Sequence, residues 1–140
     1  MAYDPKNIFA RILRGEIPSH TIYEDADTLA FMDVMPQSDG HTLVIPKAPS
    51  TGLDDADPEV LAKLIRIVQK LAPKIRESVG AAGFRLAQFN GAEAGQTVFH
   101  LHFHIIPVHA GVPLRPHTGK MGDQAAIKAL ADKIRSAITP

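Results

Sequence analysis

The sequence contains no cysteine, which excludes disulfide bonds, thiolate catalysis and cysteine-based zinc sites. It also has no excess of charge, because 15 Lys and Arg residues balance 15 Asp and Glu residues. A protein that binds the nucleic-acid backbone generally has a basic excess, so we expect no nucleic-acid partner. No apolar run is long enough to span a bilayer, and the first residues lack a secretory-signal pattern. We therefore expect no membrane partner and a cytoplasmic location.

What is present is the composition of an ordinary globular domain, with 45% hydrophobic and 21% charged residues among 140. Hydrophobic periodicity and turn residues predict its elements. The expected strands cover residues 20–25, 28–34, 41–47, 84–90 and 98–106, and the expected helices cover residues 7–14, 58–80 and 123–138. Because helices do not alternate regularly with strands, the predicted fold class is α+β with a mostly antiparallel sheet.

The longest expected helix has clear signals at its start and a conflicting signal inside it. Asp57 is suited to the N-cap and Pro58 to the first helical position. Pro73 lies within the apolar 3.6-residue pattern. A proline inside a helix removes a backbone donor and crowds the preceding turn, so we expect Pro73 to kink or shorten the helix.

The segment "GQTVFHLHFHIIP" carries three of the seven histidines at alternate positions. Side chains of a strand alternate between its two faces, so the three imidazoles share one face. That face holds Val98, His100, His102, His104 and Ile106. The other face holds Phe99, Leu101, Phe103 and Ile105, is wholly apolar, and is predicted to face the core.

The histidine row has three possible interpretations. A polar, solvent-facing strand would not place Val98 and Ile106 beside the imidazoles. A metal site is possible for two neighbouring histidines about 6.6 Å apart, but a third ligand has to come from elsewhere, with His41 and His109 as candidates. A nucleophilic histidine needs only a fixed tautomer and nearby phosphate donors. The upstream segment offers such donors at Asn90, Gly91, Gly95, Gln96 and Thr97.

These segments resemble the histidine triad (HIT) superfamily. "HLHFHII" fits its His-x-His-x-His signature with apolar spacers, and "NGAEAGQTVFH" is similar to the loop before it. "IFARILRGEIPSHTIYEDADTLAFMDVMPQSDGHTLVIPK" resembles the Hint branch of the superfamily, and the similarity covers about residues 7–107. The resemblance implies a single HIT domain over residues 1–140, with a C-terminal loop and helix from 108. It also implies a five-stranded antiparallel sheet with a long helix and a C-terminal helix, and a homodimer with joined sheets.

The resemblance further implies a role for each matching residue. His102 matches the nucleophile that forms a nucleotidyl-histidine intermediate, flanked by His100 and His104 and supported by His41. Asp33 matches the acid that binds the ribose hydroxyls. The matching purine-slot residues are Ile8, Phe9, Ile12, Phe31 and Val34, and the matching phosphate and leaving-group contacts are Asn90, Gly95, Gln96 and Thr97.

The sequence departs from relatives of this family in two ways. Many bacterial relatives hold zinc with a Cys-x-x-Cys pair and further histidines. The matching positions here are Asn7, Ala10 and the pair Ala48–Pro49, so we expect no structural zinc and no cofactor. Eukaryotic Hint proteins carry serine where Thr97 stands, and we expect this difference to change the rate rather than abolish the reaction.

The resulting hypothesis is a metal-independent nucleoside phosphoramidase. Its substrate would be a purine nucleoside 5′-monophosphate derivative such as adenosine phosphoramidate, and His102 would attack the phosphorus. Three alternatives remain: a Fhit-like dinucleoside polyphosphate hydrolase, a nucleotide-binding protein with weak catalysis, and a histidine-metal protein. The residues Arg115, His117 and Lys120 either reach a substrate or partner subunit or are solvated loop residues, and we favour the second interpretation.

Overall fold

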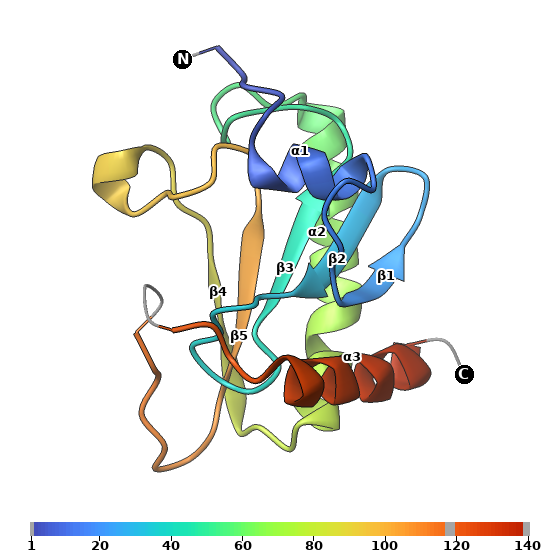
Figure 1. The fold of residues 1–140 in the computed structure, drawn as a ribbon, viewed down its shortest axis with the longest axis vertical. Coiled ribbons are helices and arrows are strands. Elements are labelled where there is room, and N and C mark those ends of the chain that lie inside the picture. Colours follow the sequence, from blue (N-terminus) through green and yellow to red (C-terminus); the bar gives the residue numbers. More distant parts are fainter. Residues whose placement is uncertain (1, 117–119, 139–140) are drawn as a thin grey trace.

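The structure is a computed structural model and describes residues 2–116 and 120–138. Its strands and helices follow the chain in the order shown in Figure 1. The strands are β1 (Thr21–Glu24), β2 (Thr28–Met32), β3 (Thr42–Pro46), β4 (Gly83–Ala87) and β5 (Phe103–Val108). The helices are α1 (Ile8–Leu13), α2 (Pro58–Ser78) and α3 (Gln124–Ile138), and a short 3-10 turn covers Ala92–Ala94.

The five strands form one sheet in the order β1-β2-β3-β5-β4, and every neighbouring pair is antiparallel. β3 pairs with β5 through Leu43 opposite His104, so the third histidine lies in the middle of the sheet. The predicted α+β class, with a five-stranded antiparallel sheet, a long helix and a C-terminal helix, is confirmed. Among the described residues, no helix is both long and apolar enough to cross a membrane.

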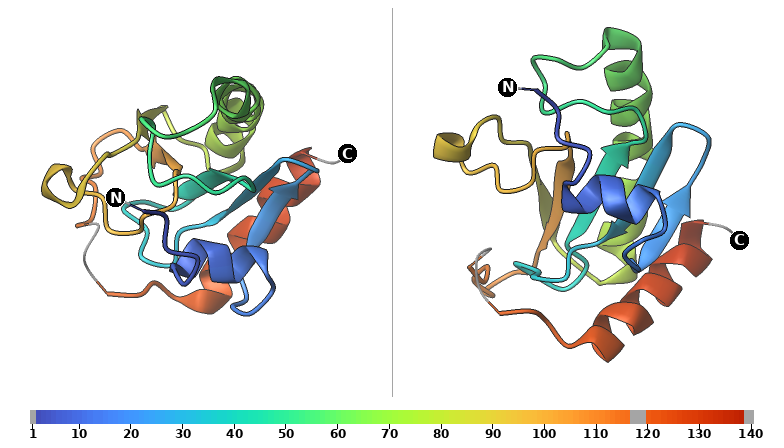
Figure 2. Two further views of the ribbon diagram at one scale, coloured as in Figure 1. Left: turned by 90° about the horizontal axis from the view of Figure 1, so that it is seen from above. Right: turned by 45° about the horizontal axis from the view of Figure 1, so that its top comes forward.

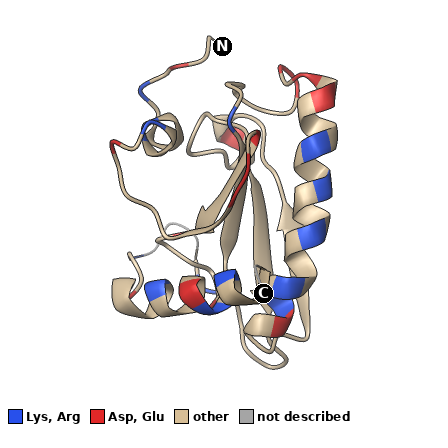
Figure 3. Ribbon diagram, turned by 90° about the vertical axis from the view of Figure 1, so that its right-hand side faces the viewer, with Lys and Arg blue, Asp and Glu red and all other residues tan. Residues whose placement is uncertain are grey.

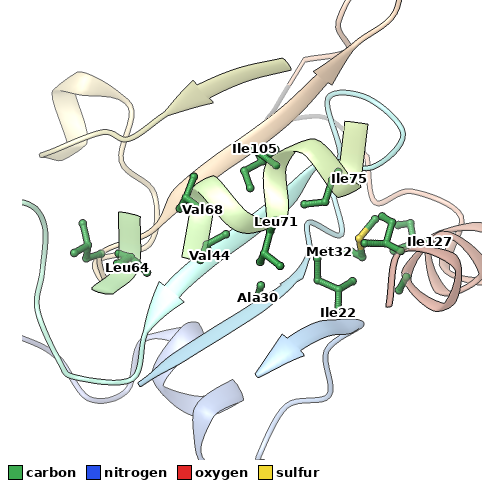
Figure 4. Packing of buried hydrophobic residues seen from close by; sticks show 14 residues of the cluster. Ile22, Ala30, Met32, Val44, Leu64, Val68, Leu71, Ile75, Ile105 and Ile127 are labelled. Carbon is green, nitrogen blue, oxygen red and sulfur yellow. The ribbon is translucent and has the colours of Figure 1, made fainter. Parts of the chain in front are cut away.

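The sheet separates a large core from a smaller one. Figure 3 shows α2 on one side of the sheet and α1 on the other, and Figure 2 gives the same arrangement from above. On the α2 side, Leu64, Val68, Leu71 and Ile75 point onto the sheet (Figure 4), and α3 completes this core. Lys and Arg residues occupy the outer side of α2 (Figure 3), as expected for an amphipathic helix.

The smaller core lies under α1 and forms the base of the candidate site. Phe9 of α1 packs against apolar side chains from β2 and β3, with Val98 partly buried beside them. These strand residues are Leu29, Phe31, Leu43 and Ile45. Because every residue of β2 and β3 is buried, both faces of these central strands are covered, which holds them rigidly beneath α1.

The histidine segment differs from the sequence prediction at its start. We expected a strand over 98–106, but β5 begins only at Phe103. Two hydrogen bonds take the preceding residues out of the ladder: the Leu101 amide donates to the Ser50 carbonyl, and the His102 side chain bonds the His100 carbonyl. The division of faces is confirmed, because Leu101 and Ile105 lie in the large core while Phe9 contacts His100 and His102.

Two further boundaries differ from the prediction. The helix α2 continues through Pro73 to Ser78, so the expected shortening is wrong. Leu71, Ala72 and Ile75 are all buried around this proline, and their packing outweighs one lost backbone hydrogen bond. The fourth strand ends at Ala87 rather than residue 90, because the chain turns there through paired side-chain amides.

Candidate functional site

A pocket of about 370 Å³ lies between α1 and the sheet, at the point where the histidine segment enters β5. Its walls are mainly apolar, and a few polar side chains also line it. Several residues predicted from the sequence line it, namely Ile8, Phe9, Ile12, Phe31, Asp33, Val34, Thr97, His102 and His104. A concave, mainly apolar pocket with a few convergent polar groups is the usual form of a small-molecule site.

The hydrogen bond made by His102 fixes its tautomer. Nδ1 lies 2.6 Å from the His100 carbonyl oxygen, which can only accept, so Nδ1 carries the proton and donates. Nε2 of the neutral ring therefore carries the lone pair. The edge-on Phe9 ring, 4.9 Å away between centroids, packs against the imidazole. His102 is thus a nearly buried imidazole held in the tautomer that a nucleophile needs.

His104 takes part in a second chain of hydrogen bonds, which begins at a backbone amide. The Gln37 amide donates to Nδ1 of His41, so the proton of neutral His41 is on Nε2. That atom lies 3.0 Å from Nδ1 of His104 and donates to it. The proton of neutral His104 is therefore on Nε2. The His104 ring lies beside His102, with 4.9 Å between the ring centroids.

Asp33 joins this network from the end of β2. Its Oδ1 accepts a hydrogen bond from the Met35 amide, and its Oδ2 lies 3.5 Å from Nε2 of His41. Its backbone amide donates to the His41 carbonyl, which fixes the carboxylate next to β3. Asp33 also lines the pocket, so a nearly buried carboxylate faces both the ligand space and the histidine network.

His100 does not line the pocket but lies directly behind His102. Its Nε2 donates to the Pro46 carbonyl at 2.8 Å, and its Nδ1 accepts from the Tyr3 hydroxyl at 2.6 Å. The side chain is fully buried, and this desolvation lowers the pKa of His100 below its usual value, against a smaller opposing effect of the Pro46 bond. His100 is therefore a neutral, positioned support rather than a second acid.

This lowered pKa predicts a loss of stability in acid. Below about pH 6.5 the unfolded chain protonates His100 while the folded chain does not, so unfolding takes up a proton. Stability therefore falls as pH falls from this value toward the lower folded pKa, by at most about 1.4 kcal/mol per pH unit from this residue. Denaturant unfolding at roughly pH 7.5 and 5.5 measures the slope. We expect a shallower slope in His100→Asn, and equal slopes would contradict the assignment.

Several predicted phosphate contacts lie away from the pocket. The Gln96 side chain is buried and ties three backbone groups together, accepting from Gly91 and donating to Thr51 and Val98. The Gly95 amide donates within the 3-10 turn at 92–94. Of the upstream donors, Thr97 lines the pocket, whereas Asn90, Gly91 and Gln96 line a separate polar hollow with Asp54 and Asp55.

Asn90 is held in that separate hollow by specific bonds. Its Oδ1 accepts from the Leu53 amide, and its side-chain amide also pairs with that of Gln88. A Cβ on Gly52 would lie 2.6 Å from Asn90 Oδ1, so a larger residue at this position would displace the Asn90 side chain. A phosphate contact by Asn90 therefore requires its side chain to exchange these bonds. The sequence could not reveal this, because a turn asparagine bonds to its own loop as readily as to an anion.

The pocket also includes residues that the sequence did not indicate. Ile17, Pro18 and Ser19 extend its wall beyond α1, and Met121 and Gln124 line it from the C-terminal segment. The Gly122 amide donates to the Val34 carbonyl at 2.8 Å, which brings that segment to the pocket. Met121 is a large apolar side chain that is 63% exposed. Its neighbours are glycines and polar residues, so nothing in the local pattern predicted its place.

The metal interpretation can be tested against the geometry. Among the described residues, potential ligand atoms of Asp33, His41 and His104 form one group within 4.8 Å of one another. Of the two histidines considered as a further metal ligand, His41 belongs to this group and His109 does not. The positions that match the zinc ligands implied by the sequence resemblance are Asn7, Ala10 and the pair Ala48–Pro49. Asn7 caps α1 by accepting from the Ala10 amide, and Ala10 and Ala48 carry no ligand atom.

The chain is similar to proteins of known family. The HIT domain model matches residues 14–111. The crystal structure of a Hit-like protein from Bartonella henselae, described as involved in cell-cycle regulation, is 49% identical and covers 97% of this chain and 99% of its own, with a TM-score of 0.90. A zinc-bound histidine triad family protein from Mycobacterium smegmatis is 34% identical over 95% of this chain and 93% of its own, with a TM-score of 0.84. An adenylylsulfatase from Arabidopsis thaliana is 38% identical over 85% of this chain and 64% of its own length.

Proposed function

We propose that this chain, which belongs to the histidine triad (HIT) family, is a purine nucleoside phosphoramidase that acts through a covalent nucleotidyl-His102 intermediate. Proteins of this family are nucleotide-binding hydrolases and transferases, and a relative is an adenylylsulfatase. The observation that carries the proposal is the fixed tautomer of His102. Its Nδ1–H is committed to the His100 carbonyl, so its Nε2 lone pair is the reactive one beside a mainly apolar pocket.

In the first step, Nε2 of His102 attacks the α-phosphorus of the bound AMP derivative, and the bond from phosphorus to the amine nitrogen breaks. The leaving nitrogen takes a proton as it departs. The Nε2–H of His104 and the hydroxyl of Thr97 are groups at the pocket with a proton to give. In the second step, water attacks the same phosphorus, the bond to His102 breaks and AMP leaves. A proton from this water returns to the group, His104 or Thr97, that protonated the amine.

The rest of the pocket supports recognition of a purine nucleoside. The apolar walls formed by Ile8, Phe9, Ile12 and Phe31 suit a flat base, because aromatic and branched side chains bury its faces. Asp33, at the junction between these walls and the histidines, is the carboxylate that we assign to the ribose hydroxyls. The wall nearest solvent includes Met121, which we assign to the exposed side of the base.

Met121 gives this assignment a direct test. Replacing Met121 by alanine should raise the Kd for AMP about threefold to tenfold, because a flexible thioether side chain buried by the ligand would be lost. The turnover number should be unchanged, because Met121 is assigned to the base and not to the reacting phosphorus. Val112→Ala is the matched control, because Val112 is similarly exposed but does not line this pocket. Equal affinity in Met121→Ala and the wild type would remove Met121 from the site.

We also propose that the chain forms a homodimer in which β4 pairs with β4 of a second copy. β4 is an edge strand, and Phe84 and Leu86 on it are large apolar side chains exposed to solvent. Phe89, just beyond its end, is exposed as well. Apolar edge strands left uncovered would aggregate, so a specific partner at this edge is favoured. Sedimentation at micromolar concentration should give twice the chain mass, and a monomer would refute the assignment.

The function is tested by comparing substrates. The protein is incubated with adenosine 5′-phosphoramidate, adenosine 5′-phosphosulfate or a diadenosine polyphosphate at equal concentration, with and without a chelator, and AMP release is measured. We expect the phosphoramidate to react fastest and the chelator to have no effect. Preference for the phosphosulfate or the diadenosine compound would retain His102 but change the substrate class. Loss of activity with the chelator would favour a metal at Asp33, His41 and His104.

A further inference from the structure

The N-terminal segment contacts the histidine triad from outside the region that matches the family. Tyr3 precedes both the matched residues 14–111 and α1, yet its hydroxyl lies 2.6 Å from Nδ1 of His100. The two rings also meet edge-on, with 5.6 Å between their centroids. His100 is completely buried, so Tyr3 reaches a group that solvent does not.

Short-range bonds fold this segment back onto the site. The backbone and side-chain nitrogens of Asn7 both donate to the Asp4 carbonyl, at 3.2 and 2.7 Å. The Arg14 guanidinium donates to the Pro5 carbonyl at 2.7 Å. These bonds tie the residues before α1 to the helix itself. The position of Tyr3 is therefore set by the same helix that supplies Phe9 to the pocket.

The bonds of His100 give the tyrosine contact a direction. The Pro46 carbonyl can only accept, so His100 donates from Nε2 and its neutral ring must accept at Nδ1. The Tyr3 hydroxyl is then the donor. Both ring nitrogens of His100 are thereby satisfied, and its orientation is fixed from two sides. The carbonyl of the same residue accepts the proton of His102 Nδ1.

We propose that Tyr3 is a positioning residue for the nucleophile, which acts by holding His100 so that the His100 carbonyl keeps His102 in its reactive tautomer and orientation. This inference rests on the proposed function of His102. Phe9 contacts both His100 and His102 edge-on, so a shift of the His100 ring is also transmitted through packing. Tyr3 touches neither the pocket nor the ligand space, so its effect should fall on the chemical step rather than on binding.

The two tyrosines of the chain provide a matched test. Tyr3→Phe keeps the ring and removes only the hydroxyl. Tyr23→Phe is the control, because the hydroxyl of Tyr23 donates to Asp25, just after β1, and its ring packs against the large core on the other side of the sheet. We expect Tyr3→Phe to lower kcat about threefold to tenfold, the value of one neutral hydrogen bond, with KM and the Kd for AMP unchanged within about twofold. Tyr23→Phe should leave all three constants unchanged.

A second readout reports the histidines without requiring activity. Nitrogen-15 NMR of the imidazoles should show the His100 Nδ1 and His102 Nδ1 signals displaced in Tyr3→Phe and unmoved in Tyr23→Phe. The inference is overturned if kcat is unchanged in Tyr3→Phe, if both variants lose the same activity, or if the His102 signal does not move. A wild type without activity on any adenylyl substrate would refute the proposed function instead, and the NMR comparison would then decide the inference by itself.

Discussion

Replacement of His102 by alanine is expected to lower turnover of adenosine 5′-phosphoramidate by at least about a thousandfold. The variant lacks the nitrogen that would form the bond to phosphorus. AMP binding should be largely kept, because the base and ribose contacts are assigned to other residues in the proposed function. Initial rates measure the first effect and titration calorimetry with AMP measures the second.

The control for this variant is His109→Ala. His109 is a histidine outside the triad that lines a different hollow, so its removal should leave the rate unchanged. Parallel losses of turnover and AMP affinity in His102→Ala would mean that the substitution disturbs the pocket as a whole. In that case the assignment of His102 as nucleophile would be wrong.

Asp33→Ala should raise the Kd for AMP by about 10- to 100-fold, which is the value of hydrogen bonds from two hydroxyls to a carboxylate. The wild type should bind 2′-deoxy-AMP and 3′-deoxy-AMP more weakly than AMP. Asp33→Ala should bind all three nucleotides with similar affinity. This comparison is a double-mutant cycle in which the second change is made on the ligand, so it isolates the contact from general damage. Titration of each of the three ligands against each of the two proteins provides six affinities, four for each cycle.

Asp39→Ala is the matched control for Asp33. Asp39 is exposed and pairs with Arg115 at 3.1 Å, outside this pocket. Its removal should not change affinity for any of the three nucleotides. If the deoxy ligands are penalised in Asp33→Ala as strongly as in the wild type, the carboxylate does not bind the ribose. Its contact with His41 would then be its main role.

The sequence predicted which side chains of the histidine segment face the core. It did not predict where the strand begins. Alternation of apolar and polar residues placed Leu101 and Ile105 in the core, and the structure agrees. The same alternation predicted a continuous strand, but β5 begins after the second histidine. A side-chain bond from His102 to a carbonyl two residues earlier competes with the strand ladder there. Such local competition has no signature in the hydrophobic pattern.

Distant contacts limited the prediction of the site. The pocket walls on α1 and β2 were predicted because they lie in the segments that resemble the family. Met121 comes from a part of the chain more than 80 residues away from those walls, and its position depends on how α3 packs. Asn90 and Gln96 were expected at the phosphate, and in the structure their side chains bond backbone groups of neighbouring loops. An amide that can donate and accept fits either role, so only the fold decides.

The C-terminal residues illustrate the same point. The Arg115 side chain pairs with Asp39, and its backbone amide donates to the Gln37 carbonyl. Arg115 therefore contacts the loop whose Gln37 amide bonds His41, and it does not line the pocket. Lys120 is exposed. His117 lies outside the described residues. The interpretation of Arg115 as a simple solvated loop residue was therefore incomplete, because its bonds fasten the segment to the loop 37–39.

Mass spectrometry of the protein stopped during turnover is the most direct test of the covalent mechanism. Wild-type protein is mixed with excess adenosine 5′-phosphoramidate, quenched in alkali to preserve phosphoimidazole, digested and sequenced by fragmentation. We predict a fraction of the peptide containing residues 100–104 with one added adenylyl group, located on His102 and absent from His102→Ala. An adduct on another residue, or active turnover with no adduct at the earliest times, would contradict the mechanism.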